Sequence, residues 1–330
     1  MVRFGNGRGD IVRGGGVAGL SRQDEAALYW IEWHAGQGIP STEWRVSSND
    51  GTATVTAPPR WARQMNRGSE GVLTDRVFVS YHSNAGGGRG TLGLYNGNND
   101  PASATPNQFE LSEFLSAEIN DDLVTLNGTF EHDWFNRTVH SLDRSDFEFG
   151  EINNYYISNE FDATIIERAF HDDEFDAELM RDAEVSRAVA RATYQGLVRY
   201  FHAFDGVTPL LFRPAAVTSV RARGNGDRTM TVEWAVPPAN AVDGDPATGY
   251  RVYRSRDGRA FDGGTLVQGG GTTSVTLSGF GPSSDTWYVM VTAVNAAGES
   301  ADSAVVAVTP AEVSASVLIV EGFDRIDRFT

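Results

Sequence analysis

The sequence changes its pattern near residue 210, and this change constrains the fold more than any other feature. Before it, short apolar runs alternate with segments of helical periodicity. After Pro209 and Pro214, short alternating segments are separated by Gly, Asn, Asp and Pro, and no helical period remains. The first pattern predicts an α/β domain with a mostly parallel sheet flanked by helices. The second predicts a separate all-β sandwich.

The α/β part is expected to alternate helices and strands. Apolar residues at helical spacing predict helices over 26–33, 108–119, 122–141 and 185–201. The pair Pro58-Pro59 can start a further short helix through Arg67. Compact apolar or β-branched runs predict strands over 52–56, 77–82, 91–95 and 163–167. Ligands of such a sheet bind at the carboxyl ends of its strands.

The second part is predicted to form seven short strands, over about 217–223, 229–235, 249–255, 264–268, 273–277, 286–294 and 302–308. Trp234, Tyr253, Leu277 and the stretch 287–300 resemble a fibronectin type III module that covers nearly all of 214–310. The resemblance implies a sandwich with a core around those three side chains. Trp287 stands where that family usually has a corner tyrosine, so the hydroxyl bond is expected to be absent or moved to Tyr288.

Both ends of the chain suggest that it belongs to a longer protein. Residues 1–20 are glycine-rich and polar and are interpreted as the tail of a preceding domain. The α/β domain then covers 21–208 and the sandwich 214–310. The aliphatic run 317–320 is typical of the opening of a buried strand, so 311–330 are interpreted as the start of a further, truncated domain.

Composition excludes several classes of function. The chain carries 27 basic and 44 acidic side chains, a net charge of −17, which disfavours binding to nucleic acid. It contains no Cys, so any metal must be held by His, Asp or Glu. No apolar run approaches the ~20 residues of a membrane span.

Two polar residues each end a predicted strand. His82 follows an aliphatic run and precedes the glycine loop at 86–88, and Glu167 ends the run 163–166. Taken alone, each is more simply explained as a structural residue. Together, in this order, they suggest a site, because a strand-end carboxylate can act as a general base with a raised pKa.

The surroundings of both residues resemble zinc-dependent N-acetylmuramoyl-L-alanine amidases over roughly 60–203. The run 77–85 resembles the strand that carries the last zinc-binding histidine, and 165–180 with the following helix resembles the part that holds the catalytic glutamate. The resemblance implies that His82 is a metal ligand and Glu167 the catalytic base. Zinc takes three protein ligands and keeps a position open for water, and a neighbouring glutamate accepts the proton as that water attacks an amide.

The family's other two ligands have no match in residues 1–60. Glu25, Glu32 and His34 are alternatives there, but they lack the strand-then-glycine context. We expect the missing ligands upstream of Met1, so that the amidase-like domain is incomplete and zinc binding by this chain is weak or absent.

Other motifs have simpler interpretations. His132, Asp133 and His140 stand at helical spacings but make a weak metal site, and the acidic run 160–184 suggests a solvated face. His171 could tune Glu167, although a surface histidine is the simpler reading. Neither the Arg-Gly-Asp at 8–10 nor the glycine-rich segments are assigned a function.

Two functions follow as hypotheses. The first is an enzyme: a peptidoglycan amidase fragment that hydrolyses the N-acetylmuramoyl–L-alanine bond, with the fibronectin type III module as a spacer. The second is a non-catalytic cell-wall or surface binding and adhesion protein built on a degenerate amidase-like domain. In both, the partner is peptidoglycan, the location is extracellular or periplasmic, and the chain is expected to be a monomer.

Overall fold

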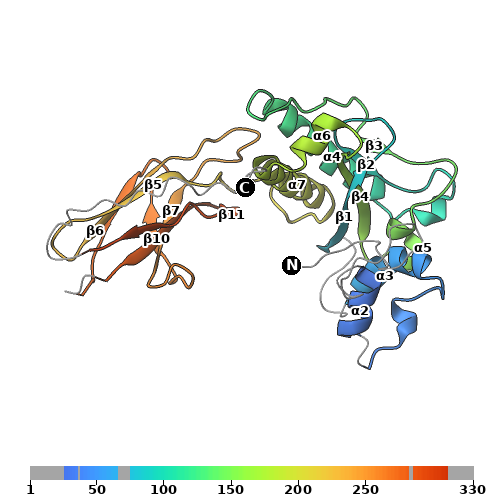
Figure 1. Cartoon of the computed structure of the whole chain (residues 1–330), viewed down its shortest axis with the longest axis horizontal. Coiled ribbons are helices and arrows are strands. Elements are labelled where there is room, and N and C mark those ends of the chain that lie inside the picture. The colour runs from blue at the N-terminus through green and yellow to red at the C-terminus, as the bar shows by residue number, and fades with distance from the viewer. Residues whose placement is uncertain (1–25, 36–37, 66–74, 282–284, 311–330) are drawn as a thin grey trace. The chain divides into compact units, whose positions relative to one another are not determined.

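The computed structural model describes residues 26–35, 38–65, 75–281 and 285–310, and the chain divides into two compact units, 1–208 and 209–330 (Figure 1). The interpreted tail at 1–20 and the strand-like run 317–320 lie outside the described residues.

The first unit is built on a four-stranded sheet of order β1-β4-β2-β3. Its strands are β1 (Val77–Asn84), β2 (Leu92–Leu94), β3 (Ser141–Leu142) and β4 (Asp162–Phe170). β1 pairs with β4 and β2 with β3 in parallel, but β2 runs antiparallel to β4. The sheet is therefore mixed, because the glycine-containing turn after β1 reverses the chain before β2.

Two long helices pack on one face of this sheet, α4 (Gln108–Thr125) and α7 (Ala183–Phe204). Their buried aliphatic residues form one core with Ile166 of β4. The helices pack closely at Gly196, where an added β carbon would lie 2.9 Å from the carbonyl oxygen of Phe114. A second core, which includes Leu92, Ile152 and Ile165, covers the other face.

Shorter helices complete the first unit. The α-helices are α2 (Ala27–Ala35), α3 (Asp50–Gln64), α5 (Asn154–Ile157) and α6 (Glu174–Leu179), and the 3-10 helices are η2 (Ser41–Glu43), η4 (Pro101–Ser103) and η5 (Gly150–Ile152). The structure confirms one predicted helix and three predicted strands, with each end shifted by at most three residues. They are the helix at 26–33 and the strands at 77–82, 91–95 and 163–167.

Two predicted elements are wrong. Residues 52–56 belong to α3, which begins earlier because the Asn49 side chain accepts hydrogen bonds from the amides of Gly51 and Thr52. The helix predicted at 122–141 is absent, since α4 ends at Thr125. There the Asn127 side chain bonds both the amide and the carbonyl of Trp134 and so folds the chain into a loop.

The second unit is a two-sheet sandwich. One sheet holds β11 (Gly298–Glu299), β10 (Trp287–Asn295), β7 (Gly249–Ser255) and β8 (Thr265–Gln268) in that order, with β12 (Val306–Val308) also paired to β10. The other holds β5 (Thr218–Gly224), β6 (Met230–Ala235) and β9 (Ser274–Leu277). Neighbouring strands are antiparallel in both sheets.

The core of the sandwich contains Trp234 and Leu277, as predicted, but not Tyr253. Alternation along β7 turns Tyr250 inward instead and places the Tyr253 hydroxyl 2.6 Å from Glu299. Trp287, at the expected corner position, packs edge-to-face on Phe280.

In the described part of the chain, no helix combines the length and the apolar character needed to cross a bilayer.

Candidate functional site

His82 and Glu167 lie side by side on neighbouring parallel strands. The two residues are paired in the register of β1 and β4, near the carboxyl end of each strand. Tyr81, the residue before His82, forms a hydrogen bond with Thr193 of α7. Because neighbouring side chains of a strand point to opposite faces, His82 and its partner in the register, Glu167, lie on the face of the sheet away from α7. The structure therefore brings the two sequence-predicted residues together near the carboxyl ends of β1 and β4, which we call the strand edge.

His82 is held by a carboxylate that sequence analysis did not identify. Its Nε2 atom lies 2.8 Å from Oε2 of Glu151 in η5, and Oε1 of the same carboxylate accepts a 2.7 Å hydrogen bond from Ser80. The hydrogen bond to Glu151 raises the pKa of His82, and burial opposes this effect. The imidazole is therefore more readily protonated than a free histidine.

Glu167 is a partly desolvated carboxyl group. Its Oε2 atom is buried and has no hydrogen-bond partner among the described residues. Burial raises the pKa of Glu167, with a further contribution from the charge of Glu151, while His82 and His171 lower it. A carboxyl with this balance can exchange a proton closer to neutral pH than a solvated one.

The glycine loop after β1 is fixed by the acidic segment that follows β4. The amides of Gly86 and Gly87 donate to Asp172, at 2.8 and 3.2 Å. Asp176 is fully buried and accepts from the amides of Gly90 and Phe170. Both acids of the run 160–184 therefore hold the loop beside the site. Asp172 is exposed, as expected for a solvated face, but the buried Asp176 is not.

The zinc donor set around His82 is incomplete in the described residues. His82 and Glu151 offer two ligand atoms, and zinc takes three from the protein. The one group of three ligand atoms within 4.8 Å of one another in the described ranges is elsewhere, at Glu131, His132 and Glu178. Zinc therefore does not fit the described residues at His82 without a further ligand.

The other histidines considered in the sequence have separate partners. His132 lies 2.6 Å from Glu178, and His140 lies 3.3 Å from Glu113. Both belong to the loop after α4, so the helical spacing proposed for them with Asp133 does not exist.

The alternative ligands near the N-terminus are also engaged or undescribed. Glu32 pairs with Arg45 at 3.0 Å, and the His34 ring stacks on Trp30. Glu25 lies outside the described residues.

Comparison with known proteins identifies the second unit. Residues 215–309 match the fibronectin type III domain family. Similar solved structures include a Fn3-like protein from Clostridium thermocellum, 23% identical, which covers 30% of this chain and 94% of that one with a TM-score of 0.24. The FN5 domain of Drosophila Lar is 18% identical, with coverages of 30% and 97% and a TM-score of 0.24. No curated protein matches the chain significantly.

Proposed function

We propose that the first unit is the part of a zinc-dependent N-acetylmuramoyl-L-alanine amidase that carries one metal-binding histidine, His82, and the catalytic base, Glu167. The observation that supports this most directly is the pairing of the two residues on adjacent strands, with an unpartnered oxygen on Glu167. The fibronectin type III module would act as a spacer or binding module. The location would be extracellular or periplasmic, where peptidoglycan is found.

The roles divide between the two residues. Glu167 would accept a proton from the attacking water and deliver it to the leaving amine, a task for which its raised pKa is suited. His82 would be one residue that holds the metal, which would supply Lewis-acid polarisation of the amide carbonyl and the water. Glu151 offers a second ligand atom, and the third would have to come from outside the described residues.

A second function is favoured by the incomplete donor set. Without a third ligand, the same strand edge would bind a glycan–peptide segment of the cell wall without cleaving it. The chain would then be a cell-wall binding or adhesion protein.

The site itself is tested by titrating the chain with the muramyl dipeptide N-acetylmuramoyl-L-alanyl-D-isoglutamine. We expect saturable binding that is weakened by His82→Gln and Glu167→Gln. Glu174→Gln serves as the matched control, because Glu174 is an exposed carboxylate of the same acidic segment. Unchanged binding in the two site variants, or no binding at all, would exclude both functions.

Cleavage separates the two functions. Amidase action leaves a new amino-terminal L-alanine on the peptide, and binding leaves none. Purified cell walls incubated with the chain and zinc should therefore be assayed for that amine, with Glu167→Gln as the comparison. Binding without any release that depends on Glu167 would favour the adhesion protein.

A further inference from the structure

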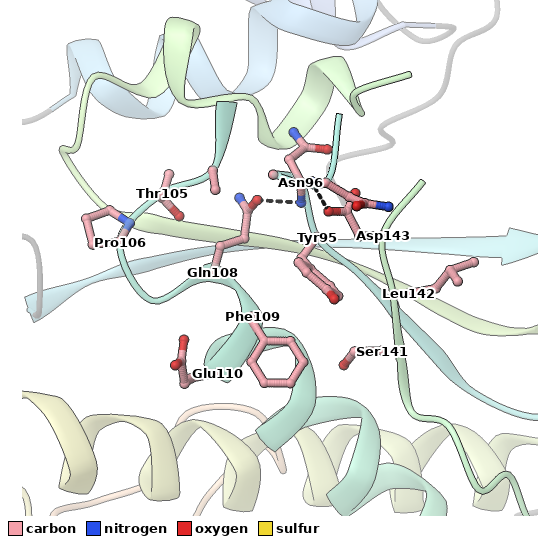
Figure 2. A pocket seen from close by; sticks show the side chains of 13 residues that line it. Tyr95, Asn96, Thr105, Pro106, Gln108, Phe109, Glu110, Ser141, Leu142 and Asp143 are labelled. Carbon is pink, nitrogen blue, oxygen red and sulfur yellow. Dashed lines mark hydrogen bonds between the residues drawn. The ribbon is translucent and has the colours of Figure 1, made fainter. Parts of the chain in front are cut away.

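A pocket in the described residues lies at the other end of the sheet from His82 and Glu167. It has a volume of about 660 Å³ and is formed by the end of β2, the start of α4 and the end of β3 (Figure 2). Because β2 runs antiparallel to β4, with Leu92 beside Glu167 and Leu94 beside Ile165, the residues after Leu94 lie toward the amino end of β4. The pocket is thus separate from the strand edge described above.

The back wall of this pocket is rigid and already hydrogen-bonded. Asn96 and Gln108 are almost fully buried, and the backbone amide of Asn96 donates to Oε1 of the Gln108 side chain at 2.8 Å. The Asn96 side chain exchanges two hydrogen bonds with the backbone of Phe149, and Gln108 donates to the carbonyl of Ile152. These amides have partners within the protein and hold the pocket in shape without a ligand.

Two oxygen atoms of the lining, in contrast, are buried without a hydrogen-bond partner among the described residues. They are Oγ1 of Thr105, a residue only 3% exposed, and Oδ1 of Asp143. The other Asp143 oxygen accepts the backbone amide of Asn98, which fixes the carboxylate in place. A buried acceptor without a donor is costly, so this geometry is suited to a ligand that donates hydrogen bonds.

The charges of the lining have one sign. Glu110 and Asp143 contribute carboxylates, and no Lys, Arg or His lines the pocket. The neighbouring Arg144 pairs with Asp146 and stacks on Phe147, so its charge is engaged outside the pocket. Burial raises the pKa of Asp143, and the charge of Glu148 adds to this effect, so a positive charge beside Asp143 would be favourable.

Aromatic rings complete the lining. Tyr95 and Phe109 meet edge-to-face, with ring centroids 5.1 Å apart, and Figure 2 shows both rings between Glu110 and the Ser141–Leu142 strand. Phe109 is 46% exposed, which leaves much of its ring available to a ligand. Aromatic faces next to carboxylates attract organic cations through the ring quadrupole.

We propose that this pocket binds a small organic cation, a primary ammonium group carried on a compact polar body. The ammonium would donate to Asp143 while its carbon body packs on Phe109 and Tyr95, and the charge of Glu110 beyond these rings would add to the attraction. Such a group occurs on amino sugars and on the side chains of amino acids, and the site would take it without any part in hydrolysis.

The test is titration of the full chain at neutral pH with four probes. Glucosamine carries the ammonium on a sugar ring, and N-acetylglucosamine and glucose carry the same ring without charge. N-acetyl-lysine methylamide carries the ammonium on an alkyl chain. We expect glucosamine, the lysine derivative or both to bind about tenfold or more tightly than the neutral sugars, as for hydrogen bonds to charged groups. Which ammonium binds more tightly identifies its source.

Variants locate the binding. Asp143→Asn and Phe109→Ala should each weaken ammonium binding, the first about tenfold or more. Asp146→Asn is the matched control, because that exposed carboxylate lies three residues away and outside the lining. Equal affinity for glucosamine and N-acetylglucosamine, unchanged binding in a folded Asp143→Asn protein, or no saturable binding of either ammonium would overturn the proposal.

Discussion

At Glu167 and His82, one carboxylate acts on two neighbouring titratable groups. The charge of Glu151 raises the pKa of His82, mainly through their hydrogen bond, and it adds to the burial that raises the pKa of Glu167. Both groups therefore retain a proton to a higher pH than they would in water. This is the electrostatic setting in which a proton can move between a side chain and a substrate near neutral pH.

We predict that Glu151→Gln lowers the pKa of His82, since the hydrogen-bonded charge is its largest raising cause. A histidine whose pKa is raised in the native state adds stability that is fully present below about pH 6.5 and is lost as the pH rises through the native value. The variant should therefore lose stability mainly at acidic pH. Proton NMR titration of the imidazole signals measures the shift, and the other five histidines serve as internal controls. An unchanged titration curve for His82 would show that the pair does not form.

Sequence reasoning could identify His82 and Glu167 because each is a polar residue at the end of an apolar strand. Register then places such residues together when the strands are neighbours and parallel. It could not identify Glu151, which belongs to a short 3-10 helix 69 residues after His82 and has no periodic signal. The pocket at Tyr95 and Phe109 was missed for a similar reason, because its lining comes from three separate segments.

In two segments of the first unit, tertiary contacts override the local preference of the residues for a helix or a strand. Thr52, Thr54 and Val55 have β-branched side chains that favour strands, yet Asn49 caps a helix there and Ala53 and Ala57 pack on its buried face. After α4, apolar spacing continues toward Trp134, but Gly128 adopts a positive φ of 83° and Trp134 is buried from a loop. Apolar periodicity thus indicated burial correctly and secondary structure incorrectly.

The packing of α4 against α7 leads to a prediction about Asp122. Its carboxylate is 5% exposed with an unpartnered Oδ2, and burial raises its pKa to about 7. For an acid with a raised native pKa, stability is greatest below about pH 4 and falls as the pH rises to about 7. Asp122→Asn should therefore raise the unfolding temperature of the first unit at pH 8, and by less at pH 5.

Calorimetry of the full chain at both pH values measures this effect. Asp121→Asn is the matched control, because the adjacent side chain is exposed. A lower unfolding temperature for Asp122→Asn at pH 8 would mean that the ionised carboxylate is stabilised by Arg191 and Arg199 more than it is penalised by burial.

For the molecule as a whole, the division into an α/β unit and a β-sandwich was predictable, because the two periodicities occupy different parts of the chain. The sandwich was also predictable strand by strand, since its residues alternate between core and solvent. The orientation of β2 was not, because a strand of three residues carries no information about its direction. The sheet of the first unit was therefore expected to be mostly parallel and is mixed.

The fibronectin type III module should fold without the rest of the chain. Its two sheets enclose their own apolar core, and the residues of that core all lie between Val217 and Val308. A fragment of residues 212–312 should therefore unfold in one cooperative thermal transition. A fragment without such a transition would show that the module depends on other parts of the chain.

Within that module, Trp234→Ala should lower the free energy of unfolding by about 3–5 kcal/mol, because it removes a large aromatic side chain from a packed core. Trp234 is 4% exposed and packs against Tyr250, with ring centroids 5.0 Å apart. Urea unfolding of the full chain measures the loss of free energy. Calorimetry of the full chain should show that only the thermal transition of the second unit is affected. Trp33→Ala is the control, because that tryptophan is 67% exposed.

The last prediction concerns zinc and turnover together. A site that needs three protein ligands but has two, His82 and Glu151, holds a metal weakly, and water on a weakly held ion is poorly activated. This 330-residue chain should therefore bind zinc weakly or not at all and release little or no peptide from cell walls, a result that favours the binding protein for the chain by itself. Isothermal titration with zinc, followed by dye release from labelled walls, measures both. Tight one-to-one binding with release that Glu167→Gln abolishes would show that residues outside the described ranges, such as Glu25, complete the site.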